Sequence, residues 1–263
     1  MIPPMEQCIP LWPHLAPYTD QCPGQAQPSL TAFSLDGARG AVVIIPGGGY
    51  SHKAEHEGAP IARMLNSVGI AAYVLNYRVH PCPHEAPLAD ARRAIRVVRS
   101  LGYEKVAVLG FSAGGHLCCA AATKYHRGDP ASTDPIERLS SRPDAFIPCY
   151  AVVTFGKYTH LGSRQMLLGD QWQDEALAHF YSNEEHITED TPPAFLWHTA
   201  EDGAVPVQNS LLLAKALADH GVPFEMHVYP KGRHGLGLAQ ENAVAAAWGR
   251  ELGRYLLEKG YGA

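Results

Sequence analysis

Short apolar runs alternate with longer amphipathic stretches along most of the chain. The apolar runs lack alternating polar positions, which is typical of strands buried on both faces of a parallel sheet. Strands are predicted at residues 30–35, 41–45, 70–75, 106–109, 144–150, 194–199 and 224–229. Between them, apolar residues recur at helical spacing and predict helices at 61–68, 88–98, 115–124, 206–220 and 243–259. This alternation predicts an α/β fold with a mostly parallel, twisted sheet that helices cover on both faces.

Two segments depart from this alternation. Residues 1–28 are rich in proline and poor in periodicity, so we expect them to run irregularly over the surface. Residues 155–190 mix aromatic residues with short helical patches and predict a small insertion that caps the sheet edge. The first two strands are expected to be joined by a turn at Asp36-Gly37. Because no internal repeat or Gly/Ser-rich linker divides the rest, residues 29–263 are expected to form a single domain.

Composition and charge narrow the range of partners. The chain is 46% hydrophobic and 18% charged, with a formal net charge of −5 and no basic block. Nucleic acid and anionic membranes are therefore not expected as partners. No apolar stretch approaches the roughly 20 residues that span a bilayer, and the first residues lack the pattern of a signal peptide. We expect a cytoplasmic protein, whose oligomeric state the sequence leaves open, including a homo-oligomer.

The six cysteines are scattered and form no CxxC pair. In a reducing compartment such cysteines are expected to be buried thiols, with a metal or redox site as the alternative. They are Cys8, Cys22, Cys82, Cys118, Cys119 and Cys149.

The segment GFSAG at residues 110–114 is the first candidate for chemistry. It follows a predicted strand and precedes a run of small residues that predicts a helix. A GxSxG segment at a strand-to-helix turn exposes its serine at the carboxyl edge of the sheet, where sites of α/β proteins form. Ser112 is therefore a candidate nucleophile.

A serine hydroxyl needs a base and an acid that orients the base. Asp202 and His234 each follow a later predicted strand, in the order serine, acid, histidine. Asp202 could instead be a turn or helix-capping residue, and His234 a turn residue in a Gly-rich loop. Glu201 is a rival acid. His116 lies one helical turn after Ser112 and is expected to point away from its hydroxyl as a structural residue.

Acyl transfer also needs N–H donors for the developing oxyanion. The backbone N–H of Ala113, directly after the serine, is one candidate. The others are Gly48 and Gly49, in a three-glycine loop after the strand at 41–45. A phosphate-binding loop would need a following Lys-Ser/Thr or a GxGxxG pattern, and neither is present.

Six segments together carry a family resemblance. They are IPGGGY (45–50), LNYR (75–78), PLADARRAIRVVR (87–99), VLGFSAGGHL (108–117), PPAFLWHTAEDGAVPVQNS (192–210) and GRHGLGLA (232–239). With them the chain resembles, from about residue 30 onward, the small α/β-hydrolase esterases on the hormone-sensitive-lipase side. It is similar in particular to the acetyl-xylan-esterase-like group of carbohydrate acetyl esterases and feruloyl-esterase-like hydrolases. Pro46 replaces the histidine of the lipase HGGG segment, and Asn76 replaces an aspartate common before Tyr-Arg. Both departures favour the carbohydrate-esterase side.

The resemblance implies an α/β-hydrolase fold and a serine esterase that needs no metal or cofactor. Ser112 would be the nucleophile, Asp202 the acid and His234 the base, with Gly48, Gly49 and Ala113 as oxyanion donors. The implied substrate is a small ester, an acetylated xylo-oligosaccharide or similar carbohydrate.

Three aromatic residues are candidates for substrate binding, namely Tyr50, Phe111 and Trp172. Trp172 lies in the 155–190 insertion, where aromatic rings could stack on a sugar or only pack the insertion's own core.

Several other functions stay open at this stage. An arylformamidase or a general short-chain carboxylesterase would use the same three residues. A peptidase of this fold usually carries a further domain, for which this chain has no room. A non-catalytic binding protein would typically have lost one of the three residues.

Overall fold

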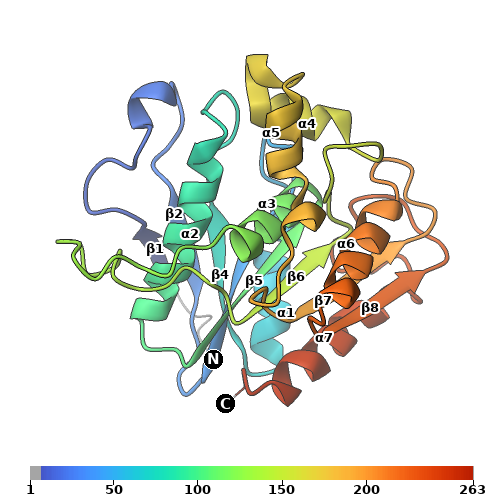
Figure 1. The fold of residues 1–263 in the computed structure, drawn as a ribbon. Helices are drawn as coiled ribbons and strands as arrows, with labels where there is room; N and C mark the ends of the chain where they lie inside the picture. The colour runs from blue at the N-terminus through green and yellow to red at the C-terminus, as the bar shows by residue number, and fades with distance from the viewer. Residues whose placement is uncertain (1–6, 263) are drawn as a thin grey trace.

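The computed structural model describes residues 7–262 and contains one eight-stranded sheet between two layers of helices (Figure 1). The strands are β1 (Gln7–Pro10), β2 (Ser29–Phe33), β3 (Gly40–Ile45), β4 (Ala71–Asn76), β5 (Lys105–Phe111), β6 (Ala145–Cys149), β7 (Ala194–Thr199) and β8 (Phe224–Tyr229). Their order across the sheet is β1-β2-β4-β3-β5-β6-β7-β8, and all neighbours from β4 to β8 are parallel. The predicted mostly parallel sheet is confirmed.

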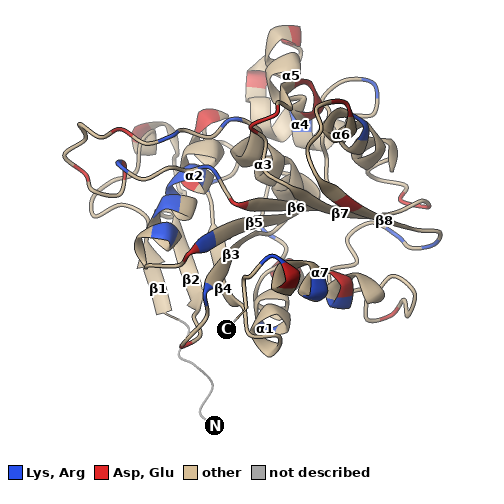
Figure 2. Ribbon diagram, turned by 60° about the horizontal axis from the view of Figure 1, so that its bottom comes forward, with Lys and Arg blue, Asp and Glu red and all other residues tan. Residues whose placement is uncertain are grey.

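Helices cover both faces of the sheet. Helices α1 (Ala59–Ser67) and α7 (Ala247–Glu258) pack on one face, and α2 (Glu85–Ser100), α3 (Ser112–Thr123) and α6 (Gln208–Asp219) pack on the other (Figure 2). Strand β3 has no polar positions because both of its faces are buried. Val42 and Ile44 belong to the hydrophobic cluster under α1 and α7, whereas Val43 and Ile45 belong to the cluster under the other helices.

The first two predicted strands do not pair with each other. A turn at residues 36–37 joins β2 to β3, but β4 lies between them in the sheet. Both edges of β3 are taken by parallel partners, β4 after the crossover through α1 and β5 on the other side. Strand β2 therefore extends the sheet by pairing antiparallel with β4.

The expectation of an irregular segment at residues 1–28 is wrong at one place. Residues 7–10 form β1, which pairs antiparallel with β2 at the edge of the sheet. An edge strand has only one partner, so it tolerates a proline such as Pro10. Residues 1–6 lie outside the described residues, and residues 11–28 contain only a short 3-10 helix, Thr19–Gln21.

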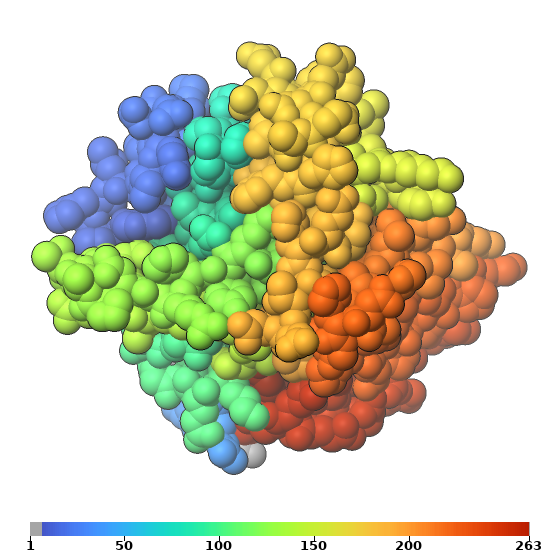
Figure 3. Space-filling model, in the orientation of Figure 1, coloured from blue at the N-terminus to red at the C-terminus, as the bar shows by residue number. Residues whose placement is uncertain are grey.

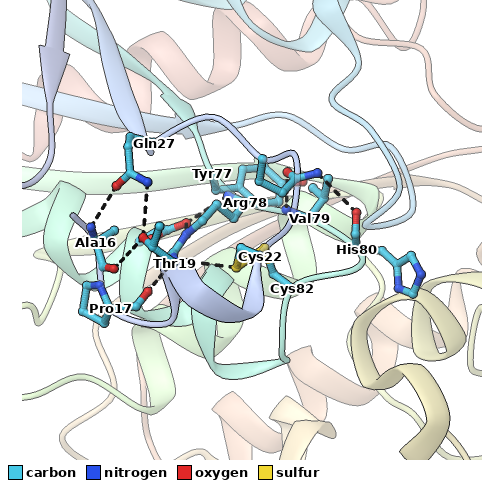
Figure 4. The surroundings of a disulfide bond; sticks show 12 residues. Ala16, Pro17, Thr19, Cys22, Gln27, Tyr77, Arg78, Val79, His80 and Cys82 are labelled. Atoms are coloured by element: carbon cyan, nitrogen blue, oxygen red, sulfur yellow. Dashed lines mark hydrogen bonds and ion pairs between the residues drawn. A yellow bond between two sulfur atoms is a disulfide. The ribbon is translucent and has the colours of Figure 1, made fainter.

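The expectation that all six cysteines are buried thiols is wrong for three of them. Cys22 and Cys82 form a disulfide bond, because the N-terminal segment folds against the loop after β4 and brings their Cα atoms within 4.5 Å (Figure 4). Cys8 is exposed, and the other three cysteines are buried free thiols. Because disulfides persist mainly in oxidising compartments, the cysteines do not support the predicted cytoplasmic location.

Residues 155–190 contain helices α4 (Leu161–Leu168) and α5 (Glu175–Tyr181), with short 3-10 helices at Gly169–Gln171 and Asn183–His186. On the molecular surface this insertion lies beside the region of α2 (Figure 3). It contacts the loop after β4, where the Tyr181 hydroxyl lies 2.9 Å from Nδ1 of His84. Within residues 7–262, no helix has the length and apolarity to cross a membrane.

Replacing Cys22 with alanine is expected to destabilise the oxidised protein. The disulfide closes a loop between residues 60 positions apart, and its loss typically costs about 2–4 kcal/mol of unfolding free energy. Urea unfolding of the variant, compared with the exposed Cys8→Ala as control, measures this difference. Equal unfolding midpoints for the two variants and the wild type would contradict the expectation.

Candidate active site

Ser112 occupies a sharp junction between β5 and α3. The helix begins at Ser112 itself, not at residue 115 as predicted, and Ser112 has a φ of 52°. A non-glycine residue in this left-handed region is strained and typical of a serine held out at a strand-to-helix turn. Gly110 and Gly114 permit the junction. A Cβ atom at Gly114 would lie 2.2 Å from the carbonyl oxygen of Ile45, and one at Gly110 would lie 2.1 Å from that of Gly114.

The structure brings together the three residues predicted as a catalytic group. Nε2 of His234 lies 2.8 Å from the Ser112 Oγ, and Nδ1 lies 2.7 Å from Oδ2 of Asp202. These residues follow β5, β7 and β8, whose carboxyl ends meet at one edge of the sheet. A carboxylate only accepts hydrogen bonds, so Nδ1 donates to Asp202 and Nε2 accepts from Ser112. In this tautomer the unprotonated nitrogen, Nε2, faces the Ser112 hydroxyl and can take its proton.

Asp202 is buried and fully hydrogen-bonded. Its Oδ1 accepts from the backbone N–H groups of Ala204 and Val205 at 3.0 and 2.9 Å, and its Oδ2 also lies 3.3 Å from Nε2 of the buried His198. Burial by itself raises the pKa of Asp202, but the hydrogen bonds from His198 and His234 outweigh it and hold that pKa below its usual value. The side chain is therefore a carboxylate at neutral pH.

The rival acid, Glu201, is not part of this arrangement. It is exposed, and its carboxylate lies 3.4 Å from the backbone N–H of Gly232.

Residues 46–50, the glycine loop, lie against the serine junction. The N–H of Gly47 donates to Oε2 of Glu57 at 2.7 Å. Gly48 and Gly49 have positive φ angles of 122° and 64°, and within residues 7–262 their N–H groups have no hydrogen-bond partner. Ala113 is the second residue of α3, and the first N–H groups of a helix have no acceptor within it. Gly48 and Gly49 also line the cleft that lies over Ser112, whereas the side chain of Ala113 is buried.

A buried carboxylate and a tyrosine, which the sequence analysis did not identify, join the glycine loop to the histidine loop at residues 230–237. Besides its bond to Gly47, Glu57 accepts a 2.5 Å hydrogen bond from the Tyr150 hydroxyl. That hydroxyl accepts from the N–H of Gly237 at 2.9 Å. The Tyr150 ring also packs edge-on against His234, with 5.2 Å between the centroids. No local sequence pattern marks these residues, because their partners lie far away in the chain.

An open cleft of about 460 Å³ lies over Ser112 and His234. Its wall combines the glycine loop, the short 3-10 helix Glu55–Glu57, the start of α4 and the histidine loop. The remaining lining residues are Gly48, Gly49, Ser51, His52, Ala54, His56, Glu57, His160, Gly162, Met166 and Gly235. Within the described residues, no group of three or more His, Cys, Asp or Glu side chains is arranged to hold a metal ion.

None of the three aromatic residues predicted to bind substrate lines this cleft. Phe111 is fully buried and packs against Tyr150 and Trp248, because the strand's alternation turns it to the face opposite Ser112's helix. Trp172 packs against the hydrophobic core from the insertion. Tyr50 is turned inward at a φ of 61° and is buried.

Tyr50 and His116 connect the glycine loop to the insertion. The Tyr50 hydroxyl lies 2.8 Å from Nδ1 of His116, and Nε2 of His116 donates to the backbone carbonyl of Tyr181 at 2.8 Å. The imidazole also stacks on Phe155. Its bonds point away from Ser112, so the predicted structural role of His116 is confirmed. Burial lowers the pKa of His116 to about 3.

This neutral histidine predicts a pH dependence of stability. Between about pH 3 and the usual histidine pKa of about 6.5, the unfolded chain binds a proton at residue 116 that the folded chain does not. Stability contributed by His116 is therefore lost as the pH falls through this range. His116→Gln is expected to flatten the dependence by up to about 1.4 kcal/mol per pH unit. Urea unfolding between pH 7 and 4.5 measures the slope, with the exposed His14→Gln as reference, and equal slopes would contradict the expectation.

Known proteins resemble this chain in sequence. Residues 34–217, more than half of the chain, match the BD-FAE family. The chain is 38% identical over 245 residues to endo-1,4-beta-xylanase B of Butyrivibrio fibrisolvens and 32% identical over 226 residues to acetylxylan esterase of Xylanibacter ruminicola. These matches cover 88% and 81% of this chain, but it spans only 38% and 44% of the two relatives.

Solved structures resemble it over its whole length. The acetyl ester-xyloside bifunctional hydrolase from Caldicellulosiruptor lactoaceticus superposes with a TM-score of 0.92 at 42% identity, covering 100% of this chain and 99% of that one. MGS-M1, an α/β hydrolase enzyme from a Medee basin deep-sea metagenome library, gives 0.70 at 25% identity, covering 96% of each chain. The predicted α/β-hydrolase fold and the resemblance to acetyl-xylan-esterase-like hydrolases are confirmed, and the chain belongs to the BD-FAE family.

Proposed function

We propose that this chain is a serine carboxylesterase that removes acetyl groups from acetylated carbohydrates, such as xylo-oligosaccharides, through an acyl-enzyme. The observation that carries the proposal is the hydrogen-bonded chain from Ser112 through His234 to Asp202 at the floor of an open cleft. A buried carboxylate, an imidazole in the correct tautomer and a strained serine are the parts that nucleophilic acyl transfer needs.

In the first step the Ser112 Oγ attacks the ester carbonyl carbon while Nε2 of His234 takes the hydroxyl proton. The carbonyl oxygen becomes an oxyanion. When the intermediate collapses, the bond from the carbonyl carbon to the alcohol oxygen breaks, and His234 returns the proton to the departing alcohol. In the second step a water molecule attacks the carbonyl carbon of the acyl-serine while His234 takes a proton from it. The bond to the Ser112 Oγ then breaks, His234 returns the proton to that oxygen, and acetate leaves. Asp202 stays ionised, holds Nδ1 protonated and stabilises the transient imidazolium.

The oxyanion is stabilised by the N–H groups of Gly48, Gly49 and Ala113. Those of the two glycines have no partner within residues 7–262, and that of Ala113 lies at the N-terminus of α3, so no protein hydrogen bond must break before they bind the oxyanion. The helix dipole of α3 adds positive potential at the same place. In this scheme His234 carries each transferred proton, and side-chain and backbone groups stabilise the charges that form.

The names of the relatives support an acetylated carbohydrate as the substrate. The residues that line the cleft include Ser51, His52, His56 and His160. An arylformamidase or a general short-chain carboxylesterase would use the same three residues, so substrates must distinguish these alternatives. The matched structure's name also includes xyloside hydrolysis. Glycosidases commonly need two carboxyl groups flanking the bond. Among residues 7–262 the only Asp or Glu that lines the cleft is Glu57, whose two oxygens already accept hydrogen bonds from Gly47 and Tyr150.

Ser112→Ala tests the proposal. We expect acetate release from acetylated xylo-oligosaccharides to fall by about 10⁴-fold or more, because the residue that forms the acyl-enzyme is lost. Ser67→Ala, which changes a serine at the end of α1 outside the cleft, is the control.

Assays with other substrates distinguish the alternative activities. Activity confined to p-nitrophenyl butyrate or N-formylkynurenine would keep the mechanism and reject the carbohydrate substrate. Hydrolysis of an aryl xyloside would show that the carboxylate argument is wrong. Unchanged activity of Ser112→Ala would reject the proposal altogether.

Tyr150→Phe is expected to lower kcat about tenfold while the protein stays folded. Without the hydroxyl, the N–H of Gly237 and one oxygen of Glu57 are left unpaired in a buried place, at a typical cost of about 1–3 kcal/mol. The glycine and histidine loops then lose their shared support. Tyr255→Phe is the matched control, because the buried Tyr255 hydroxyl has no hydrogen-bond partner in the described chain. Equal kcat values for the two variants would contradict the positioning role of Tyr150.

A further inference from the structure

His160 lines the cleft but takes no part in the scheme above. It directly precedes α4, the first helix of the insertion, and shares the cleft with Ser112 and His234. Its imidazole is partly buried, and its Nδ1 caps α4. Histidine is an unusual choice for this position, where Ser, Thr, Asp and Asn are preferred. Capping the helix therefore does not by itself explain why a histidine occupies position 160.

The hydrogen bonds of the cap fix the tautomer of His160. Nδ1 lies 3.2 Å from the backbone nitrogen of Ser163, which can only donate, and 2.8 Å from its hydroxyl. Nδ1 is therefore the unprotonated acceptor, and the proton of the neutral ring sits on Nε2. Nε2 has no hydrogen-bond partner within the described part of the chain. A donor without a partner is therefore left on a residue that lines the cleft.

The ring lies next to the backbone of Gly162. A Cβ atom at Gly162 would lie 3.4 Å from Cε1 and 3.9 Å from Nε2 of His160, so the imidazole lies over the bare backbone of that glycine. Burial, and next the proximity of His234, lower the pKa of His160 below its usual value. His160 thus presents a neutral N–H donor, which adds no positive charge next to the imidazolium that forms on His234.

We propose that Nε2–H of His160 donates a hydrogen bond to an oxygen of the alcohol part of the bound ester, a sugar hydroxyl or ring oxygen, and so selects carbohydrate acetates over esters of simple alcohols. This inference rests on the function proposed above. Within an acetyl ester the carbonyl oxygen is bound by the N–H groups of the glycine loop and Ala113, and the ester oxygen receives its proton from His234. The acetyl methyl accepts nothing. The acceptor for His160 must therefore lie in the sugar.

Two substitutions separate the two nitrogens of this ring. His160→Asn keeps an acceptor that can cap α4 but has no atom at the position of Nε2. His160→Gln places an amide N–H near the Nε2 position and gives up the cap. The measured quantity is the ratio of kcat/KM for an acetylated methyl xyloside to kcat/KM for phenyl acetate.

We expect this ratio to fall about tenfold in His160→Asn, the loss typical of one hydrogen bond, and to stay within about threefold of wild type in His160→Gln. An unchanged ratio in His160→Asn overturns the inference, including the case in which both substrates slow equally, because His160 would then act on the reacting groups or the fold. An equal fall in both variants also overturns it, since the donor would not be the cause.

A measurement on the wild type covers the case in which a variant does not fold. The inference requires the acetylated xyloside to exceed cyclohexyl acetate, whose ring carries no further oxygen, by about tenfold or more in kcat/KM. Equal values overturn it. A wild type that cleaves phenyl acetate but no sugar acetate rejects the proposed substrate class and this inference with it. A wild type that prefers sugar acetates, together with an unchanged His160→Asn, rejects His160 alone.

Discussion

The close approach of the β5–α3 junction to the glycine loop is the constraint on which the rest of the site depends. Strands β3 and β5 are parallel neighbours, with Ile45 opposite Gly110 in the register. Both chains turn sharply just beyond this pair. A Cβ atom at Gly47 would lie 2.8 Å from the carbonyl oxygen of Phe111 and 3.0 Å from the Ser112 Cβ. Only a backbone without side chains permits this distance, and it places Ser112 directly against the glycine loop.

Hydrogen bonds between buried polar groups hold the surrounding loops in place around Ser112. Glu57 and Tyr150 link the glycine loop to the histidine loop, and His56 adds a bond from Nε2 to the carbonyl of Gly235 at 3.0 Å. In a low-dielectric environment such fully hydrogen-bonded networks are rigid. Breaking one hydrogen bond would leave a buried polar group with neither a protein partner nor water, which costs free energy. Tyr50 and His116 extend the support to the insertion, which in turn carries His160 into the cleft. The geometry of Ser112, Asp202 and His234 thus depends on several segments that lie far apart in the chain.

A buried ion pair holds the loop after β4, against which the N-terminal segment and the insertion both rest. Arg78 and Asp90 are fully buried and joined by hydrogen bonds of 2.6 and 3.0 Å between their side chains. Burial raises the pKa of Asp90, and the contact with Arg78 opposes that rise. Arg78 also donates to the carbonyl of Pro17, next to the Cys22–Cys82 disulfide. Removing either member of the pair would leave an uncompensated charge in the interior.

The sequence by itself determined the elements of the parallel core and the order of Ser112, Asp202 and His234 along it. Those features follow from local patterns, namely apolar runs, helical spacing and glycine turns, and parallel strands bring their carboxyl ends to one edge wherever they pair. Only the tertiary structure decided the edge strand β1, the separation of β2 from β3 and the Cys22–Cys82 bond. It also decided which side chains face the cleft, burying Tyr50 and Phe111 and bringing in Glu57 and His160. The physical reason is the same in each case. These features depend on contacts between residues far apart in the chain, and no local pattern encodes which distant partner a side chain meets.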